Sequence, residues 1–78
     1  MNQYNDKGLS HGHWERYHPN GNLNDKGHYN NGKKDGYWEY YWYNGSLYYK
    51  GNFINGERDG YWEWYNDSGS LITKQFFL

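Results

Sequence analysis

The chain repeats itself with a period of 24 residues, and this repeat limits the folds that it can adopt more than any other feature. Three copies align without a gap, over residues 5–28, 29–52 and 53–76. The coinciding positions are Gly12, Gly36 and Gly60; Trp14, Trp38 and Trp62; Glu15, Glu39 and Glu63; Leu23, Leu47 and Leu71; and Lys26, Lys50 and Lys74. Repeats of this length form arrays in which each copy packs on its neighbours, so we expect one repeat domain over residues 1–78.

Turn sequences divide each copy into short strands. Asn-Gly dipeptides favour two-residue hairpin loops, because both residues accept a positive φ. They stand at 20–21, 31–32, 44–45 and 55–56, with Lys7-Gly8 and Ser68-Gly69 as weaker members. The chain has 11 Gly and no Ala, which disfavours helices. The spacing predicts an all-β antiparallel meander of stacked hairpins, with strands at 1–6, 9–19, 22–30, 33–43, 46–54, 57–67 and 70–78.

The loop positions also predict which residues face each other. A two-residue loop at 44–45 places Glu39 opposite Lys50 and Trp38 opposite Gly51. The equivalent loops pair Glu15 with Lys26, Glu63 with Lys74, Arg16 with Asp25, Trp14 with Gly27 and His13 with His28. Three opposite-charge pairs follow from a register that was chosen only from the turns, and cross-strand pairs of this kind stabilise a sheet.

The other kind of turn, centred on 31–32 and 55–56, predicts a bend. The same rule places Gly51 opposite Gly60 and Tyr49 opposite Trp62. Two facing glycines carry no side chains, so the sheet can curve sharply there and neighbouring Trp rings can cover the bare backbone. We therefore expect a curved, single-layer sheet with a groove.

Side-chain alternation gives this sheet two different faces. One face collects large apolar rings and is the better core: Trp38, Tyr40, Trp42, Leu47, Tyr49, Phe53, Trp62, Trp64 and Leu71. The other face mixes tyrosines with charges: Tyr37, Glu39, Tyr41, Tyr48, Lys50, Tyr61, Glu63 and Tyr65. On this second face we expect Tyr rings to lie over the Glu–Lys pairs.

The repeat resembles a known family. The pattern Gly-x-Trp-x-x-Tyr-x-x-Asn-Gly-x-Leu-x-x-Lys-Gly-x-Phe-x-Asn-Gly runs from Gly36 to Gly56 and is similar to the MORN-repeat variant of many bacterial proteins. The resemblance covers essentially the whole chain and implies stacked hairpins in an extended, twisted single sheet. Bacterial proteins of this variant are commonly labelled antitoxins, which implies a protein partner, whereas related eukaryotic repeats are linked to membrane lipids and to scaffolding. The end copies depart from the pattern at His11, His13 and Gln75.

Charge and composition argue against several classes of partner. Eight Lys and Arg are balanced by nine Asp and Glu, for a formal net charge of −1. This balance gives no reason to expect nucleic acid or an anionic membrane. The chain has no Cys for disulfides or thiolate metal sites, and no apolar run approaches the roughly 20 residues that span a bilayer. The segment 1–7 lacks the apolar stretch of a signal peptide, so we expect a cytoplasmic location.

The sequence offers little catalytic or metal-binding chemistry. His11, His13 and His28 form the only constellation that resembles a metal site, and polar surface near a repeat end explains them better. The glutamates at the equivalent positions 15, 39 and 63 each face a lysine in the predicted register. This fits surface ion pairs rather than acid–base catalysis. No Ser–His–Asp order or Cys nucleophile is present. We predict no enzyme activity, no metal and no cofactor.

The functional hypothesis is based on the aromatic residues. The chain has 11 Tyr, 5 Trp and 3 Phe, and Tyr and Trp are enriched in binding hot spots. We expect a small module that inhibits a protein partner by steric occlusion, either an antitoxin or a phage-encoded inhibitor of a host defence protein, which would act in the bacterial host cytoplasm. The predicted partner-binding residues are Trp38, Tyr40, Trp42, Tyr49, Trp62, Trp64, Phe76 and Phe77.

Two alternatives stay open. The last strand, 70–78, has an open edge guarded only by Lys74, and such an edge invites strand addition. The chain could therefore be a scaffold subunit that forms a homodimer through its C-terminal edge strand. The other alternative is a carbohydrate-binding repeat that uses its Trp and Tyr rings as stacking platforms.

Overall fold

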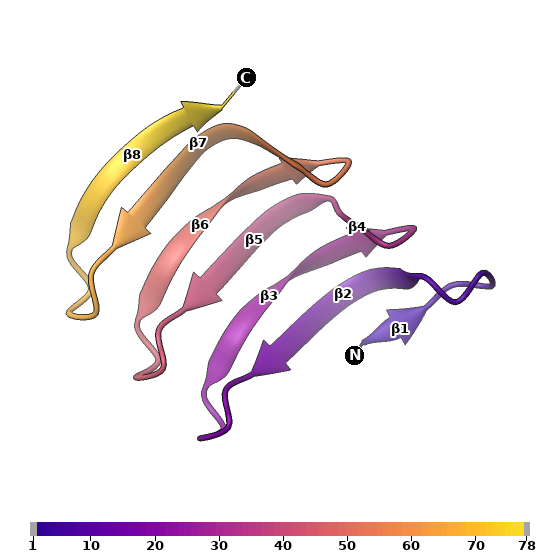
Figure 1. The fold of residues 1–78 in the computed structure, drawn as a ribbon, viewed down its shortest axis with the longest axis horizontal. Coiled ribbons are helices and arrows are strands. Elements are labelled where there is room, and N and C mark those ends of the chain that lie inside the picture. The colour runs from indigo at the N-terminus through magenta and orange to yellow at the C-terminus, as the bar shows by residue number, and fades with distance from the viewer. Residues whose placement is uncertain (1, 78) are drawn as a thin grey trace.

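The protein is a single antiparallel sheet, one layer thick (Figure 1). The structure is a computed structural model that describes residues 2–77. The strands are β1 (Gln3–Tyr4), β2 (Ser10–Tyr17), β3 (Leu23–Asn30), β4 (Lys33–Lys34), β5 (Gly36–Tyr41), β6 (Leu47–Ile54), β7 (Glu57–Tyr65) and β8 (Leu71–Phe77). They lie in the order β1-β2-β3-β5-β6-β7-β8, with β4 paired to β3. The Cα trace measures 41 × 35 × 11 Å, so the predicted single-layer meander is confirmed.

The strands bow along their length, and the predicted strand 33–43 is divided into β4 and β5 (Figure 1). The predicted strand ends at residues 1 and 78 lie outside the described residues. Within residues 2–77 no helix is long and apolar enough to cross a membrane.

The hairpin loops that join the two strands of one copy are longer than the sequence predicts. The Trp42 amide donates to the carbonyl of Ser46 (2.7 Å), and the Gly45 amide donates to the carbonyl of Trp42 (2.9 Å). The loop therefore holds three residues, Tyr43–Gly45, and only its Gly has a positive φ (93°). This is a type I turn followed by a left-handed glycine, and Pro19 in the first copy fits the second position of such a turn. The prediction of two-residue loops here was wrong.

The predicted register of the charged residues survives this error because a bulge follows each long loop. Beyond the loop, Tyr41 pairs with Leu47 but Tyr40 pairs with Tyr49, so Tyr48 is an extra residue on β6. The bulge restores the register that a two-residue loop would have given, and Glu39 lies opposite Lys50. The same compensation places Glu15 opposite Lys26, Arg16 opposite Asp25, His13 opposite His28 and Glu63 opposite Lys74. Of the three predicted Glu–Lys pairs, all within the described residues, only Glu63–Lys74 forms an ion pair, because Lys26 and Lys50 contact the glutamate of the next copy.

The turns between copies are two-residue loops, as predicted. Asn31 and Asn55 have φ values of 51° and 55°, and each precedes a glycine that also has a positive φ, which is the type I′ geometry. The register beyond these turns is not the predicted one. Ile54 lies opposite Glu57, yet Tyr49 lies opposite Trp64 rather than Trp62.

The shift arises near Gly60, whose φ of 73° takes the chain out of the strand conformation. Between the pairs Asn52–Asp59 and Lys50–Glu63, β7 holds three residues and β6 holds only Gly51, so the register shifts by two and Gly51 does not face Gly60. An equivalent shift separates β4 from β5, where Gly36 has a φ of 95°. A shift of two residues keeps each side chain on its predicted face, because the side-chain period of a strand is two.

Tryptophan rings occupy the space that glycines leave. A Cβ atom on Gly51 would lie 2.1 Å from the Trp62 ring, and one on Gly27 would lie 2.0 Å from the Trp38 ring. The indole N–H of Trp62 also donates to the carbonyl of Asn52 (3.1 Å). Trp rings thus cover bare backbone as predicted, and each ring locks one copy onto the copy before it. At the equivalent position in the last copy, Gln75 lies opposite Trp62.

These rings form the core on one face of the sheet. Its buried members are Trp14, Trp38, Phe53 and Trp62, and the half-buried rings that pack against them are Tyr29, Tyr40, Tyr49, Trp64 and Phe77. Three residues assigned to this core from the sequence lie outside it: Trp42, Leu47 and Leu71. Trp42 follows the bulge and stacks on Tyr48 at 3.8 Å between ring centroids. Leu71 borders the equivalent bulge in the last copy and is 52% exposed.

The packing of the Trp62 ring on Gly51, called the interlock below, predicts that one added methyl group at Gly51 has a large effect on stability. Gly51→Ala should lower the free energy of unfolding by about 3 kcal/mol, because the new Cβ must displace the Trp62 ring. Gly60→Ala is the matched control, since open space surrounds this position and only its positive φ opposes alanine. It should lower the free energy of unfolding by about 1 kcal/mol. Urea unfolding measures both, and an equal loss in the two variants would contradict the interlock.

Candidate functional site

The face that carries the Trp cluster, called the aromatic face below, exposes a ladder of parallel rings. Tyr40 and Tyr49 stack with their centroids 4.2 Å apart and their planes at 10°. Trp64 continues the ladder 6.0 Å beyond Tyr49, at 16°. These rings lie opposite each other on β5, β6 and β7, so cross-strand pairing holds them parallel. The ladder is a platform of ring edges, because the stacked faces cover one another, and the backbone of three strands fixes it in place.

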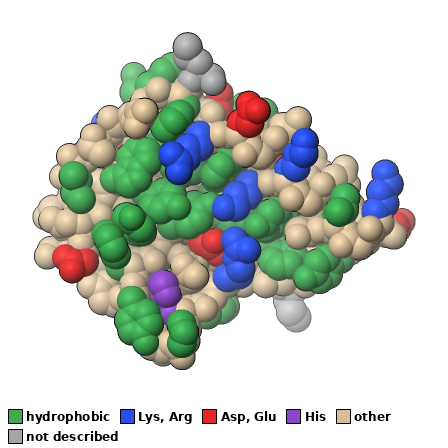
Figure 2. Space-filling view, in the orientation of Figure 1, with side chains coloured by type: hydrophobic (Ala, Val, Ile, Leu, Met, Phe, Trp, Pro, Cys, Tyr) green, Lys and Arg blue, Asp and Glu red, His purple; other side chains and the backbone are tan. Residues whose placement is uncertain are grey.

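Two cations lie over this platform at equivalent positions of the second and third copies. The Lys34 ammonium lies 4.8 Å from the Trp38 ring centroid, 4.7 Å from that of Tyr40 and 5.3 Å from that of Phe53. Arg58 lies over four rings: Trp62 at 5.0 Å, Phe77 at 5.4 Å, Trp64 at 5.6 Å and Tyr49 at 6.0 Å. Figure 2 shows a broad hydrophobic field with Lys and Arg side chains lying over it. The aromatic face is therefore cationic as well as apolar.

The first copy replaces ladder rings with an ion pair. Arg16 holds the place of Tyr40, and Asp25 holds the place of Tyr49. The Arg16 guanidinium donates two hydrogen bonds to the Asp25 carboxylate, at 3.0 and 2.7 Å. The carboxylate raises the pKa of Arg16 further, and Asp25 itself is only 5% exposed. This bidentate pair satisfies both charges, so the first copy adds no free charge to the face.

The structure separates the predicted partner-binding residues into three groups. Tyr40, Tyr49, Trp64 and Phe77 lie half-buried on the aromatic face, where a partner can reach them. Trp38 and Trp62 are fully buried, so they support the platform and offer no surface to a partner.

The third group lies away from the platform. The indole N–H of Trp42 donates to the carbonyl of Tyr65 (3.1 Å), which links the hairpin loops of neighbouring copies. Phe76 is 52% exposed and packs against Tyr61, at 4.8 Å between centroids, on the opposite face of the sheet. Phe76 therefore shares no surface with the ladder, whereas Trp42 reaches it through Tyr48, which stacks on Trp42 and packs edge-on against Tyr49 at 4.8 Å between centroids.

Sequence reasoning missed the two cations of the aromatic face. Lys34 and Arg58 each follow a turn, where charged residues are ordinary surface. Their separation of one repeat period was the available signal, because it places both on the same face as the Trp rings. Burial lowers the pKa of Lys34, which shows that its ammonium is partly withdrawn from water.

The opposite face, called the polar face below, is a row of tyrosine–glutamate clusters. The hydroxyls of Tyr41 (2.6 Å) and Tyr37 (3.0 Å) both donate to the Glu39 carboxylate, and Lys26 lies 3.6 Å from it. Burial acts to raise the pKa of Glu39, but the bonds from these tyrosines and the lysine outweigh it, so the pKa is lowered. The predicted layer of Tyr rings over Glu–Lys pairs is confirmed.

The same arrangement recurs in the other copies. Tyr65 donates to Glu63 (2.6 Å), which also lies 3.6 Å from both Lys50 and Lys74. Tyr17 donates to Glu15 in the first copy (2.5 Å). These bonds lower the pKa of Glu63 and of Glu15, and in each case the tyrosine hydroxyl is the main cause.

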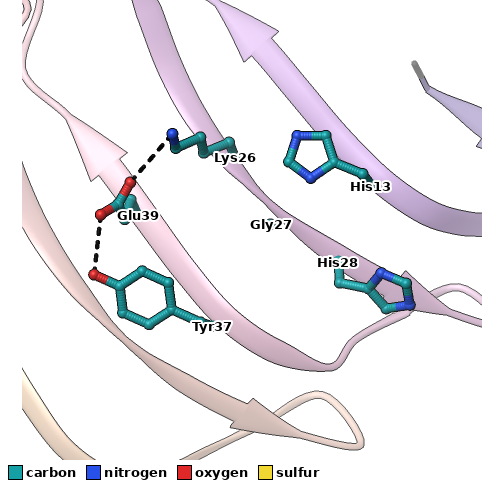
Figure 3. A pocket seen from close by; sticks show the side chains of 6 residues that line it. All are labelled: His13, Lys26, Gly27, His28, Tyr37 and Glu39. Atoms are coloured by element: carbon teal, nitrogen blue, oxygen red, sulfur yellow. Dashed lines mark hydrogen bonds and ion pairs between the residues drawn. The ribbon is translucent and has the colours of Figure 1, made fainter.

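A shallow depression of about 430 Å³ lies on the polar face between the first two copies. Its lining residues are His13, Lys26, Gly27, His28, Tyr37 and Glu39, as Figure 3 shows. The charges within it are already paired, since Lys26 contacts Glu39 and His13 Nε2 lies 3.1 Å from Glu15. The rings of His11 and His28 are 6.4 Å apart. Across the described residues, 2–77, no group of three or more His, Asp or Glu is placed to hold a metal ion.

The comparisons with known proteins identify the repeat. The family model of the MORN repeat variant matches residues 10–31, 34–55 and 58–78, which together cover most of the chain. The protein belongs to this family and contains three of its repeats. The matched segments keep the 24-residue period and begin five residues later than the copies as we divided them. Comparison with curated proteins and with solved structures gave no match.

The tyrosine–glutamate clusters predict a pH-dependent stability. Glu39 has a lowered pKa in the folded state, so its contribution is present at neutral pH and is lost as the pH falls below about 4.5. Tyr41→Phe removes the shorter hydroxyl bond and should lower the free energy of unfolding by about 1 kcal/mol at pH 7. At pH 3 the difference from the parent protein should be smaller than at pH 7, because the carboxylate becomes protonated as the pH falls.

Tyr37→Phe is the control, since its longer bond of 3.0 Å should contribute less. Urea unfolding at pH 7 and pH 3 measures all three proteins. A loss for Tyr41→Phe that is equal at both pH values would show that the hydroxyl does not act through the ionised carboxylate.

Proposed function

We propose that this protein is a small, non-enzymatic cytoplasmic module that binds a protein partner through its aromatic face and inhibits that partner by covering its working surface. The observation that carries the proposal is the ladder of Tyr40, Tyr49 and Trp64, which leaves large rings half-exposed and fixed. Rings that are already held lose little conformational freedom on binding, which favours affinity.

The shape of the molecule suits inhibition by occlusion. A sheet of 41 × 35 Å can cover the roughly 800 Å² that each partner contributes to a standard interface. A rigid single layer places this area on a partner without offering a reactive group of its own. Membership of the MORN repeat variant family supports an antitoxin-like role, since bacterial proteins of this variant are commonly labelled antitoxins. A phage-encoded inhibitor of a host defence protein is the other form that the proposal takes.

Capture from a lysate of the source organism tests the proposal with substitutions taken from the repeat itself. Tyr49→Thr places on the ladder the residue that the third copy carries at position 73. Tyr61→His is the matched control, since His13 holds its place in the first copy and Tyr61 is 69% exposed on the polar face. The parent chain and Tyr61→His should retain one partner in equal amounts, and Tyr49→Thr should retain about a tenth of it.

The captured partner is then assayed for its own activity with and without this protein. Inhibition by the parent chain and by Tyr61→His, but not by Tyr49→Thr, supports the proposal. A partner that Tyr49→Thr retains in full, or whose activity the protein does not change, would reject it.

A scaffold is the second candidate function, and the surface of β8 favours it. Leu71, Ile72 and Phe76 are each more than half exposed, and β8 is the last strand of the described sheet. An apolar strand with an unpaired side can add a second copy as a homodimer. Light scattering across a hundredfold range of concentration should then show dimers that Ile72→Lys abolishes. A monomer at every concentration would remove this candidate.

A further inference from the structure

The cations of the aromatic face identify the chemistry of what it binds. Lys34 and Arg58 lie over rings, and within residues 2–77 neither forms an ion pair with a carboxylate. On the polar face, by contrast, Lys26, Lys50 and Lys74 each lie within 3.6 Å of a glutamate. On the aromatic face Arg16 is paired with Asp25, whereas Lys34 donates to the Tyr40 hydroxyl and Arg58 lies over rings, so neither of these two cations is neutralised by a carboxylate.

The surroundings of these cations make an added carboxylate favourable. Lys34 is half-buried among Trp38, Tyr40 and Phe53, where water screens charge poorly. An oppositely charged group brought to this place gains more than it would on an exposed surface. The buried carboxylate of Asp25 accepts both of its side-chain hydrogen bonds from Arg16 and forms no ion pair with Lys34.

The spacing of the cations limits the shape of the ligand. Lys34 and Arg58 are equivalent positions of adjacent copies, so two strand spacings, about 10 Å, separate their backbones. A polyproline II segment presents residues i and i+3 on the same side about 9.3 Å apart. A β-strand presents i and i+2 on one side at about 6.7 Å, which fits less well.

The ring ladder favours the same conformation. Aromatic-lined grooves recognise polyproline II segments, because proline rings pack between aromatic side chains and the preformed segment loses little freedom on binding. The stacked rings of Tyr40, Tyr49 and Trp64 run across the strands, in the direction that separates the two cations. One ligand can then contact both features.

We propose that the aromatic face binds an acidic, proline-containing peptide segment in the polyproline II conformation, with carboxylates three residues apart placed on Lys34 and Arg58. This inference rests on the proposed function, since it names the chemistry of the segment by which the partner is recognised. Single-stranded nucleic acid also stacks on rings and meets cations, but the net charge of −1 disfavours it.

A synthetic peptide of four Glu-Pro-Pro units, capped at both ends, is the probe. Titration followed by tryptophan fluorescence gives its affinity, and indole N–H resonances show whether the signal of Trp64 moves. The peptide should bind and shift Trp64. Four Gln-Pro-Pro units, and a peptide of the same composition with its glutamates adjacent in pairs, should each bind at least about tenfold more weakly.

Variants of the protein locate the binding. Lys34→Gln and Arg58→Gln should each weaken the Glu-Pro-Pro peptide about tenfold, whereas Lys74→Gln, which removes a cation from the polar face, should leave its affinity unchanged. Thermal unfolding confirms that each variant folds, and Tyr49→Thr gives an independent test at the ladder. Affinity that none of Lys34→Gln, Arg58→Gln and Tyr49→Thr reduces would overturn the inference.

Three further outcomes would also overturn it: no binding of the Glu-Pro-Pro peptide, equal binding of the Gln-Pro-Pro peptide, or tighter binding of a 12-residue oligothymidylate. These failures differ from failure of the proposed function. If the parent chain captures a partner and Tyr49→Thr does not, the protein-binding role is supported even when the peptide does not bind. Peptide binding without a captured partner would keep the ligand chemistry and reject the inhibitor.

Discussion

The packing of a Trp ring on a Gly of the neighbouring copy is the interaction on which this structure depends. A single-layer sheet has no second layer to cover its apolar side chains. Trp38 and Trp62 are nevertheless fully buried, because each lies flat where Gly27 or Gly51 leaves the backbone bare. Backbone pairing then holds the ladder rings side by side on the same face, above the buried Trp rings that support them. The core and the candidate binding face are therefore two levels of one cluster of rings.

Most of the sheet was predictable from the sequence because two features that the prediction missed, the third loop residue and the bulge, have opposite effects on the register. Each intra-copy loop holds three residues instead of two, and the bulge that follows, at Tyr48 in the second copy, restores the register. The register shift at Gly60 moved the partner of Tyr49 but not its face, since the shift was even. Dipeptides report where a chain turns. They do not indicate the register shift at a glycine with positive φ, because that shift depends on how the next Trp packs.

The candidate site was only partly predictable for a related reason. Alternation placed Trp38 and Trp64 on the same face, and they differ only in depth, which depends on whether a glycine lies beneath the ring. The cations were missed because Lys34 and Arg58 resemble ordinary charges beside turns. Their role on the aromatic face appears only when the strands place them over rings. Periodicity identifies equivalent positions in the copies. Three-dimensional packing is needed to tell which rings are buried and support the face and which are exposed to a partner.

The direction of the Trp–Gly contact gives the array a polarity. Trp38 and Trp62 each pack on a glycine of the preceding copy, so a further copy that packed in the same way would need a bare backbone to receive its Trp. At the last such position stands Gln75, whose side chain occupies the place that the ring of a following copy would need. The Gln75 side chain therefore blocks, at the edge of β8, the Trp–Gly contact that joins the described copies. Glycine at this position would leave the backbone bare and allow this edge to receive the Trp of another hairpin.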